Sequence, residues 1–233
     1  MLEVNGVNSF YGKAQVLNDL NFDVARSTVV ALLGRNGAGK TTTMKSIMQL
    51  VRPRKGKIIY QGQDITGWPS HKVARNGLGY VPEERRIFTQ LTVLENLEVG
   101  RQPPRDGCTT WTEDMVFDLF PNLAERRHNR GKALSGGEQQ MLTIARTLMG
   151  NPAFILLDEP SEGIAPVIVE QMARVILQLK DEGLTVLLSE QNLHFAQAVA
   201  DAVVIIEHGT QKFAGSLASL QSQPEIRDQY LSV

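Results

Sequence analysis

The stretch GRNGAGKTT (residues 34–42) decides how the chain folds. It matches the phosphate-binding pattern G-x-x-x-x-G-K-[ST], follows the apolar run VVALL (residues 29–33) and precedes a helical pattern over residues 40–50. Its glycines let the backbone curl so that successive N–H groups point inward, and the helix N-terminus adds a partial positive charge. The alternative is a glycine-rich turn that binds nothing, but the complete pattern in this context favours a P-loop that holds nucleotide phosphates.

In a P-loop the lysine reaches the β- and γ-phosphates, and the hydroxyl that follows it binds Mg²⁺. These residues are Lys40 and Thr41 in this chain. Mg²⁺ and a nucleotide that carries β- and γ-phosphates are therefore the predicted cofactors. The predicted nucleotide-binding residues of the loop are Gly34, Asn36, Gly37, Gly39, Lys40, Thr41 and Thr42.

The later stretch FILLDEP (residues 154–160) is an apolar run that ends in two carboxylates. Asp158 is placed to bind Mg²⁺, as the second acidic element of P-loop NTPases does. Glu159 is then free to orient or deprotonate the attacking water. Two carboxylates at a strand end are often only a solvated cap, but the P-loop in the same chain favours the catalytic interpretation.

A second possible phosphate cradle, LSGGEQQMLTIAR, occupies residues 134–146. Ser135 stands at a plausible helix N-cap, and Gly136 and Gly137 expose N–H groups at the start of a helix that continues to about Met149. An ordinary helix start without a ligand would use the same residues. The motif alone does not explain why one chain would need two cradles.

LSGGEQQ resembles the signature motif of ABC-type ATPases, and its position between the P-loop and LLDEP is that of the family. The resemblance covers nearly the whole chain. It implies a head-to-tail dimer with a second ATPase subunit, either a sister chain or a second copy. In that dimer Ser135, Gly136 and Gly137 would close on the nucleotide held by the other subunit. Tyr11 stands where the family stacks an aromatic ring on adenine, although packing would explain a lone tyrosine equally simply.

Two positions depart from the family pattern. Most members place a glutamine that touches Mg²⁺ after the strand LGYV, where this chain has Glu83, and a histidine that contacts the γ-phosphate after TVLLSE, where it has Gln191. Glu83 is thus a predicted metal ligand whose charge would also repel the γ-phosphate. Gln191 can donate a hydrogen bond but cannot carry a proton. We expect Glu159 and Lys40 to perform the chemistry and Gln191 to position.

The combination of GYVPE, SGGEQQML, SEGIAP and EQN resembles one ATPase subunit of branched-chain amino-acid importers, a type that includes urea, amide and aromatic-acid importers. The resemblance implies peripheral attachment to the cytoplasmic face of the inner membrane. Transmembrane permeases would be direct partners and would contact residues 83–88 and the helices after Thr92. A solute-binding protein would be an indirect partner. The transported solute contacts none of this chain and cannot be identified from it.

Composition agrees with an α/β fold of ordinary globular type. The chain has 233 residues, 42% of them hydrophobic, with 24 basic and 25 acidic side chains and one cysteine. No apolar run reaches the ~20 residues of a membrane span, and the net charge of -1 gives no basic field for nucleic acid. Apolar runs that alternate with helical patterns predict a mainly parallel sheet flanked by helices, and the family resemblance implies a RecA-like P-loop NTPase core. We expect an antiparallel β-layer near the N-terminus, a core formed by residues 1–90 and 150–233, and an inserted helical subdomain at about 91–149.

Three alternatives remain open on the sequence. A soluble ABC ATPase of translation or DNA repair would carry two cassettes or a long coiled coil, and this chain shows neither. The second alternative is a scaffold subunit that binds nucleotide without hydrolysing it. Glu159 and the intact P-loop argue against this alternative, whereas the departures at Glu83 and Gln191 leave it open. An exporter-type lipopolysaccharide ATPase would usually retain the glutamine and histidine that this chain lacks.

Overall fold

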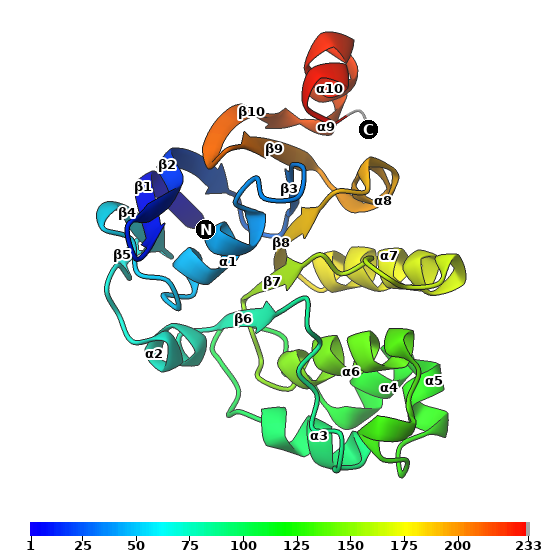
Figure 1. Ribbon diagram of the computed structural model, residues 1–233. Coiled ribbons are helices and arrows are strands. Elements are labelled where there is room, and N and C mark those ends of the chain that lie inside the picture. The colour runs from blue at the N-terminus through cyan, green and yellow to red at the C-terminus, as the bar shows by residue number, and fades with distance from the viewer. Residues whose placement is uncertain (232–233) are drawn as a thin grey trace.

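The computed structural model describes residues 1–231, whose strands form two sheets (Figure 1). The first sheet is antiparallel, in the order β2-β1-β4-β5, and contains β1 (Leu2–Tyr11), β2 (Ala14–Val24), β4 (Lys55–Tyr60) and β5 (Gln63–Asp64). The second follows the order β10-β9-β3-β8-β7-β6 and contains β3 (Val29–Leu33), β6 (Leu78–Val81), β7 (Phe154–Asp158), β8 (Thr185–Glu190), β9 (Ala202–Glu207) and β10 (Thr210–Ser216). Only β10 is antiparallel to its neighbour in the second sheet. These sheets confirm the predicted β-layer and mainly parallel core.

The central strands are buried on both faces, which explains their continuous apolar runs. Side chains alternate between the two faces of a strand. In β3, Val30 and Leu32 enter the core between the two sheets, whereas Val29, Ala31 and Leu33 enter the core on the other face. The sheet therefore separates two hydrophobic cores, and a ligand can approach only at its strand ends.

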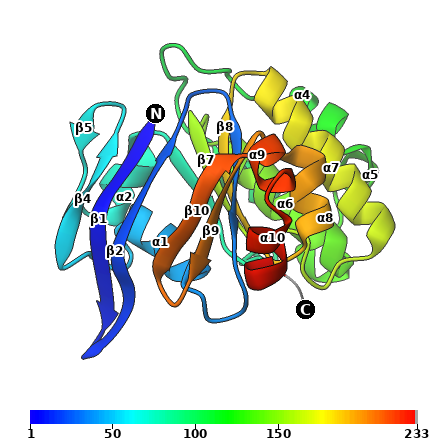
Figure 2. The same cartoon turned by 90° about the horizontal axis from the view of Figure 1, so that it is seen from above.

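Helices cover both faces of the parallel sheet (Figure 2). Helix α1 (Lys40–Ile47) lies between the sheets, where Met44 and Ile47 are fully buried. The opposite face is covered by α6 (Gly136–Leu148), α7 (Pro166–Asp181) and α8 (Leu193–Val199). The sequence predicts that the first helix continues to Leu50, but Gln49 adopts a left-handed backbone (φ 58°) and ends it earlier.

Helices without an intervening strand follow β6 and lead to β7. They are α3 (Val93–Gly100), α4 (Glu113–Leu119), α5 (Pro121–Glu125), the short 3₁₀ helix Gly131–Ala133, and α6. Thr92 and Ser135 start α3 and α6 through capping boxes with Glu95 and Glu138. The remaining helices are α2 (Ser70–Arg75), α9 (Leu217–Gln221) and α10 (Pro224–Leu231). Within residues 1–231, each helix is too short or too polar to cross a bilayer.

Candidate functional site

The glycine-rich loop lies at the carboxyl end of β3 and leads into α1. Gly37 and Gly39 adopt φ angles of 79° and 109°, which side chains other than glycine rarely tolerate. A Cβ atom on Gly34 would lie 2.4 Å from the carbonyl oxygen of Ile206. Three glycines of the pattern are thus required by backbone geometry.

Lys40 lies under this loop and is only 3% exposed. Its Nζ donates to the carbonyl oxygens of Gly34 at 2.7 Å and Arg35 at 3.2 Å, and lies 3.1 Å from Oε1 of Glu159. These contacts fix the ammonium group between the loop and the catalytic candidate. A buried cation in this place can neutralise charge on a bound phosphate.

Asp158 ends β7 and is completely buried. Its carboxylate accepts hydrogen bonds from Thr41 Oγ1 at 3.1 Å, Ser189 Oγ at 2.6 Å and the Tyr80 hydroxyl at 3.1 Å. Burial raises the pKa of Asp158, although the three hydrogen bonds oppose the shift. Sequence reasoning missed Ser189 and Tyr80. The parallel pairing of Asp158 with Ser189 in the sheet places the first of them beside the carboxylate.

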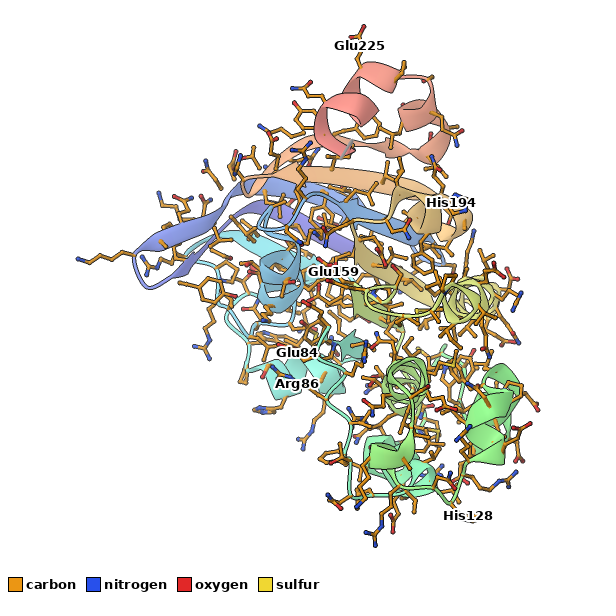
Figure 3. All side chains as sticks on the ribbon, turned by 45° about the vertical axis from the view of Figure 1, so that its right-hand side comes forward. Glu84, Arg86, His128, Glu159, His194 and Glu225 are labelled. Carbon is orange, nitrogen blue, oxygen red and sulfur yellow. The ribbon has the colours of Figure 1, made fainter. Side chains whose placement is uncertain are left out.

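Glu159 follows in a left-handed conformation (φ 47°), unusual for a residue with a side chain. Its backbone N–H donates to Ser189 Oγ at 3.0 Å, which helps to hold that geometry, and its Oε2 accepts from Gln191 Nε2 at 2.7 Å. Burial raises the pKa of Glu159, but hydrogen bonds from Glu162 and Gln191 and the charge of Lys40 outweigh it and hold the pKa below its usual value. The group is therefore an ionised acceptor, suited to orienting a water molecule. Figure 3 shows Glu159 beside α1, in the middle of the molecule.

Two further carboxyl groups surround Glu159. A hydrogen bond shared with Glu159, together with burial and nearby negative charges, raises the pKa of Glu162 to about 7. Glu190 is 2% exposed, and its Oε1 accepts from the backbone N–H of Ser161 at 3.1 Å. Burial raises the pKa of Glu190 as well. The sequence pattern did not predict the contact of Glu162 with Glu159.

A cavity of about 430 Å³ opens over the P-loop. It brings together most of the predicted nucleotide ligands, being lined by Val16, Asn36, Gly37, Gly39, Lys40, Thr41, Thr42, Glu83 and Glu159. Gly34 lies at the base of the cavity, where its carbonyl oxygen accepts a hydrogen bond from Nζ of Lys40. Tyr11 is 48% exposed at the end of β1, where its stacking on adenine stays a prediction.

The second predicted cradle does not line this cavity. Ser135 caps α6, its Oγ accepting from the backbone N–H of Glu138 at 3.3 Å, and Gly136 and Gly137 form the first turn. Helix α6 packs on the face of the parallel sheet opposite to α1 (Figure 1). Ser135, Gly136 and Gly137 are therefore available to something other than the nucleotide of their own chain.

The oxygen atoms of Thr41 and Asp158 fit a hard cation such as Mg²⁺, which prefers one or two carboxylates together with substrate phosphates. Within residues 1–231 no group of three or more His, Cys, Asp or Glu side chains is placed to hold a metal by itself. These residues therefore suit a metal that arrives with a nucleotide. Burial, followed by the charges of Glu159 and Asp158, raises the pKa of Glu83, which leaves its predicted metal role open.

Comparison with known proteins gives consistent matches. Residues 17–162 match the protein family described as ABC transporter. The chain is 42% identical, over 99% of both chains, to the high-affinity branched-chain amino acid transport ATP-binding protein BraG of Pseudomonas aeruginosa. It is 36% identical to the lipopolysaccharide export system ATP-binding protein LptB of Haemophilus influenzae, over 99% of this chain and 97% of that protein.

Solved structures agree in fold. The ATP binding subunit of an ABC transporter is 30% identical, with a TM-score of 0.80 over 97% of this chain and 94% of that chain. A nucleotide-free ATP-binding cassette is 24% identical, with a TM-score of 0.82 over 97% and 96%. A cassette solved as a dimer with ADP and Pi is 21% identical, with a TM-score of 0.80 over 93% and 99%. The last two likenesses concern the fold alone.

Proposed function

The chain belongs to the ABC transporter family, and on that premise we propose that it powers import of branched-chain or related amino acids through membrane permeases. As a member it is an ATP-binding subunit that hydrolyses ATP. The importer assignment rests on one observation above all. The 42% identity to the branched-chain amino acid transport protein extends over 99% of both chains and exceeds the 36% identity to the lipopolysaccharide export protein.

The proposed chemistry is positioning plus charge neutralisation. Lys40 and the loop N–H groups hold the phosphates, and Glu159 orients the attacking water while Gln191 positions Glu159. Thr41 and Asp158, with Glu83 as a further candidate, would hold Mg²⁺, which supplies charge neutralisation when bound. The contacts among Lys40, Glu159 and Gln191 support these roles, because they join the three side chains within hydrogen-bond distance.

The second cradle supports a head-to-tail dimer with another ATPase subunit, either a sister chain or a second copy. Ser135, Gly136 and Gly137 would then complete the site that faces them from the other subunit. Their separation from the P-loop of their own chain is the supporting observation. ABC cassettes of the same fold have been solved as dimers.

A groove of about 480 Å³ supports permease binding near the predicted contact region. Residues from α2, β6, α3 and α6 line it, including Val99, which is 53% exposed, and Arg146. Arg146 Nη1 is buried without a hydrogen-bond partner in residues 1–231. An amphipathic permease segment with an acidic side chain would cover the apolar wall and pair with this guanidinium. Attachment to the cytoplasmic face of the inner membrane follows from this partner.

Uptake by cells that carry Glu159→Gln in place of the wild-type chain tests the proposal. Labelled leucine, isoleucine and valine should enter at least tenfold more slowly, whereas an unrelated solute should enter at the wild-type rate. Uptake of urea, amides and aromatic acids is measured in the same cells. If uptake of only one of these solutes is lost, the transported substrate belongs to that class. The identity to LptB makes lipopolysaccharide export the second candidate. Normal amino-acid uptake with lipopolysaccharide retained in the inner membrane would contradict import.

A further inference from the structure

The turn that follows β6 carries an arginine with no assigned role. Arg85 and Arg86 both adopt left-handed backbone conformations, with φ angles of 63° and 38°. Such conformations are unfavourable for residues with a side chain and persist only where the surroundings fix them. Here α6 fixes them, because Thr143 Oγ1 donates to the Arg85 carbonyl and Arg146 Nη2 donates to the Arg86 carbonyl at 2.8 Å.

The Arg85 side chain is directed at the signature motif of its own chain. A Cβ atom on Gly136 would lie 2.6 Å from Nη1 of Arg85, so the guanidinium packs directly against Gly136. A Cβ atom on Gly163 would lie 3.7 Å from Nη2. The guanidinium therefore lies between the signature motif and the loop that follows Glu159.

The donors of this guanidinium are not used within the chain. In the described part of the chain, no carboxylate or other acceptor forms an ion pair or hydrogen bond with the Arg85 side chain. Arg85 also does not line the cavity over the P-loop. The neighbouring Arg86 differs, since its Nε lies 3.5 Å from Glu84 Oε2, and Figure 3 shows the two side by side.

We propose that Arg85 is a phosphate-contacting residue that acts on the nucleotide of the other subunit in a head-to-tail dimer of this chain. The inference rests on the proposed function, which places that nucleotide against Ser135, Gly136 and Gly137. A guanidinium packed on Gly136 would meet the phosphates there, and its planar fork matches phosphate oxygens. Arginines supplied by a partner accelerate related phosphoryl transfers by 10³–10⁵-fold, so we expect at least a tenfold effect.

Hydrolysis by dimers assembled from two differently tagged chains tests the direction of action. Glu159 lies 3.1 Å from Lys40 of the same chain. The substitution Glu159→Gln therefore inactivates the site at the P-loop of the chain that carries it, and it marks that chain in a mixed dimer. With Glu159→Gln on one chain and Arg85→Gln on the other, the intact P-loop still faces an intact Arg85, and about half of wild-type activity should remain. With both substitutions on one chain and a wild-type partner, activity should fall at least tenfold further.

The controls separate contact from folding. Arg86→Gln removes a neighbouring charge and should leave both dimer combinations at about half of wild-type activity. Each Arg85 variant should bind ATP as a single chain with the wild-type Kd and melt at the wild-type temperature. Arg85→Lys, which keeps the charge but loses the planar fork, should restore part of the activity lost in Arg85→Gln.

Three outcomes overturn the inference. Reversed activities of the two combinations would mean that Arg85 acts on its own P-loop. Equal activities, whether high or low, would mean that it has no directional role. If wild-type dimers of this chain hydrolyse no ATP, the self-pairing fails and the inference falls with it, an outcome visible before any Arg85 variant is assayed.

Discussion

Glu159 is held on both of its oxygen atoms, by Lys40 at 3.1 Å and by Gln191 at 2.7 Å. In the proposed mechanism the carboxylate carries the charge that orients water, whereas Gln191 contributes one neutral hydrogen bond that water can replace. We therefore expect Glu159→Gln to lower kcat by about 100-fold or more, within the usual range for a general base. Gln191→Ala should lower kcat by only about tenfold.

Phosphate release at saturating ATP measures both values, with the exposed Gln221→Ala on α9 as a matched control that should hydrolyse at the wild-type rate. If Gln191→Ala is as slow as Glu159→Gln, the ranking of the two residues is wrong. Gln191 would then contribute to the chemistry and not only to positioning.

Glu162 makes stability depend on pH in a defined direction. Its pKa rises from 4.5 to about 7 on folding, so the folded chain retains a proton that the unfolded chain releases. The free energy of unfolding must therefore fall as pH rises from about 4.5 to about 7. Glu162→Gln removes this loss. Relative to wild type it should melt at a higher temperature at pH 8 and show no such gain at pH 4.5. A gain of equal size at both pH values would show that titration is not its cause.

Helix α3 presents Val99 to the groove beside Arg146. Val99→Ser should weaken permease contact by removing apolar surface from the interface. Transport by the assembled importer should fall several-fold, while basal hydrolysis by the isolated chain stays within about twofold of wild type. Leu177→Ser on α7 is the matched control, because Leu177 is 39% exposed but lies outside the groove. An equal fall in basal hydrolysis would contradict a docking role.

Some helix and strand boundaries could be predicted from sequence patterns, and others could not. The glycine positions of the P-loop and the apolar runs of β3, β7 and β8 follow from local chemistry, and the structure confirms these strands. The end of α1 depends on the left-handed turn at Gln49. The sequence does not predict this turn, because a glycine, the usual residue in such a conformation, is absent from that position. Strand β10 is half exposed along its length, so it lacks the apolar run that identifies its neighbours.

At the scale of the whole molecule, the sequence predicts which residues belong to the site better than it predicts how they are held. Lys40, Asp158 and Glu159 are identified by short motifs, and the structure brings them together. Ser189 and Tyr80, which hold Asp158, come from separate strands and carry no motif of their own. Their contacts depend on strand order and register, which are properties of the folded sheet.

The positions of the P-loop and the signature motif relative to the parallel sheet explain why the chain has a second cradle. Ser135 begins α6 on one face of the parallel sheet, and Lys40 begins α1 on the other. The two segments therefore lie on opposite faces of the sheet, and Ser135 does not line the cavity over Lys40. We therefore propose that two chains share each nucleotide, with the P-loop from one and the signature motif from the other.

The mass of Glu159→Gln in solution, with and without Mg-ATP, tests this claim most directly, because blocked hydrolysis should trap the closed state. We expect a 25.8 kDa monomer alone or with Mg-ADP and a particle of about twice that mass with Mg-ATP. Substituting Ser135 and Gly137 together should abolish the dimer while ATP still binds. A chain that binds ATP at saturation and remains at 25.8 kDa would contradict a site shared between two copies of this chain.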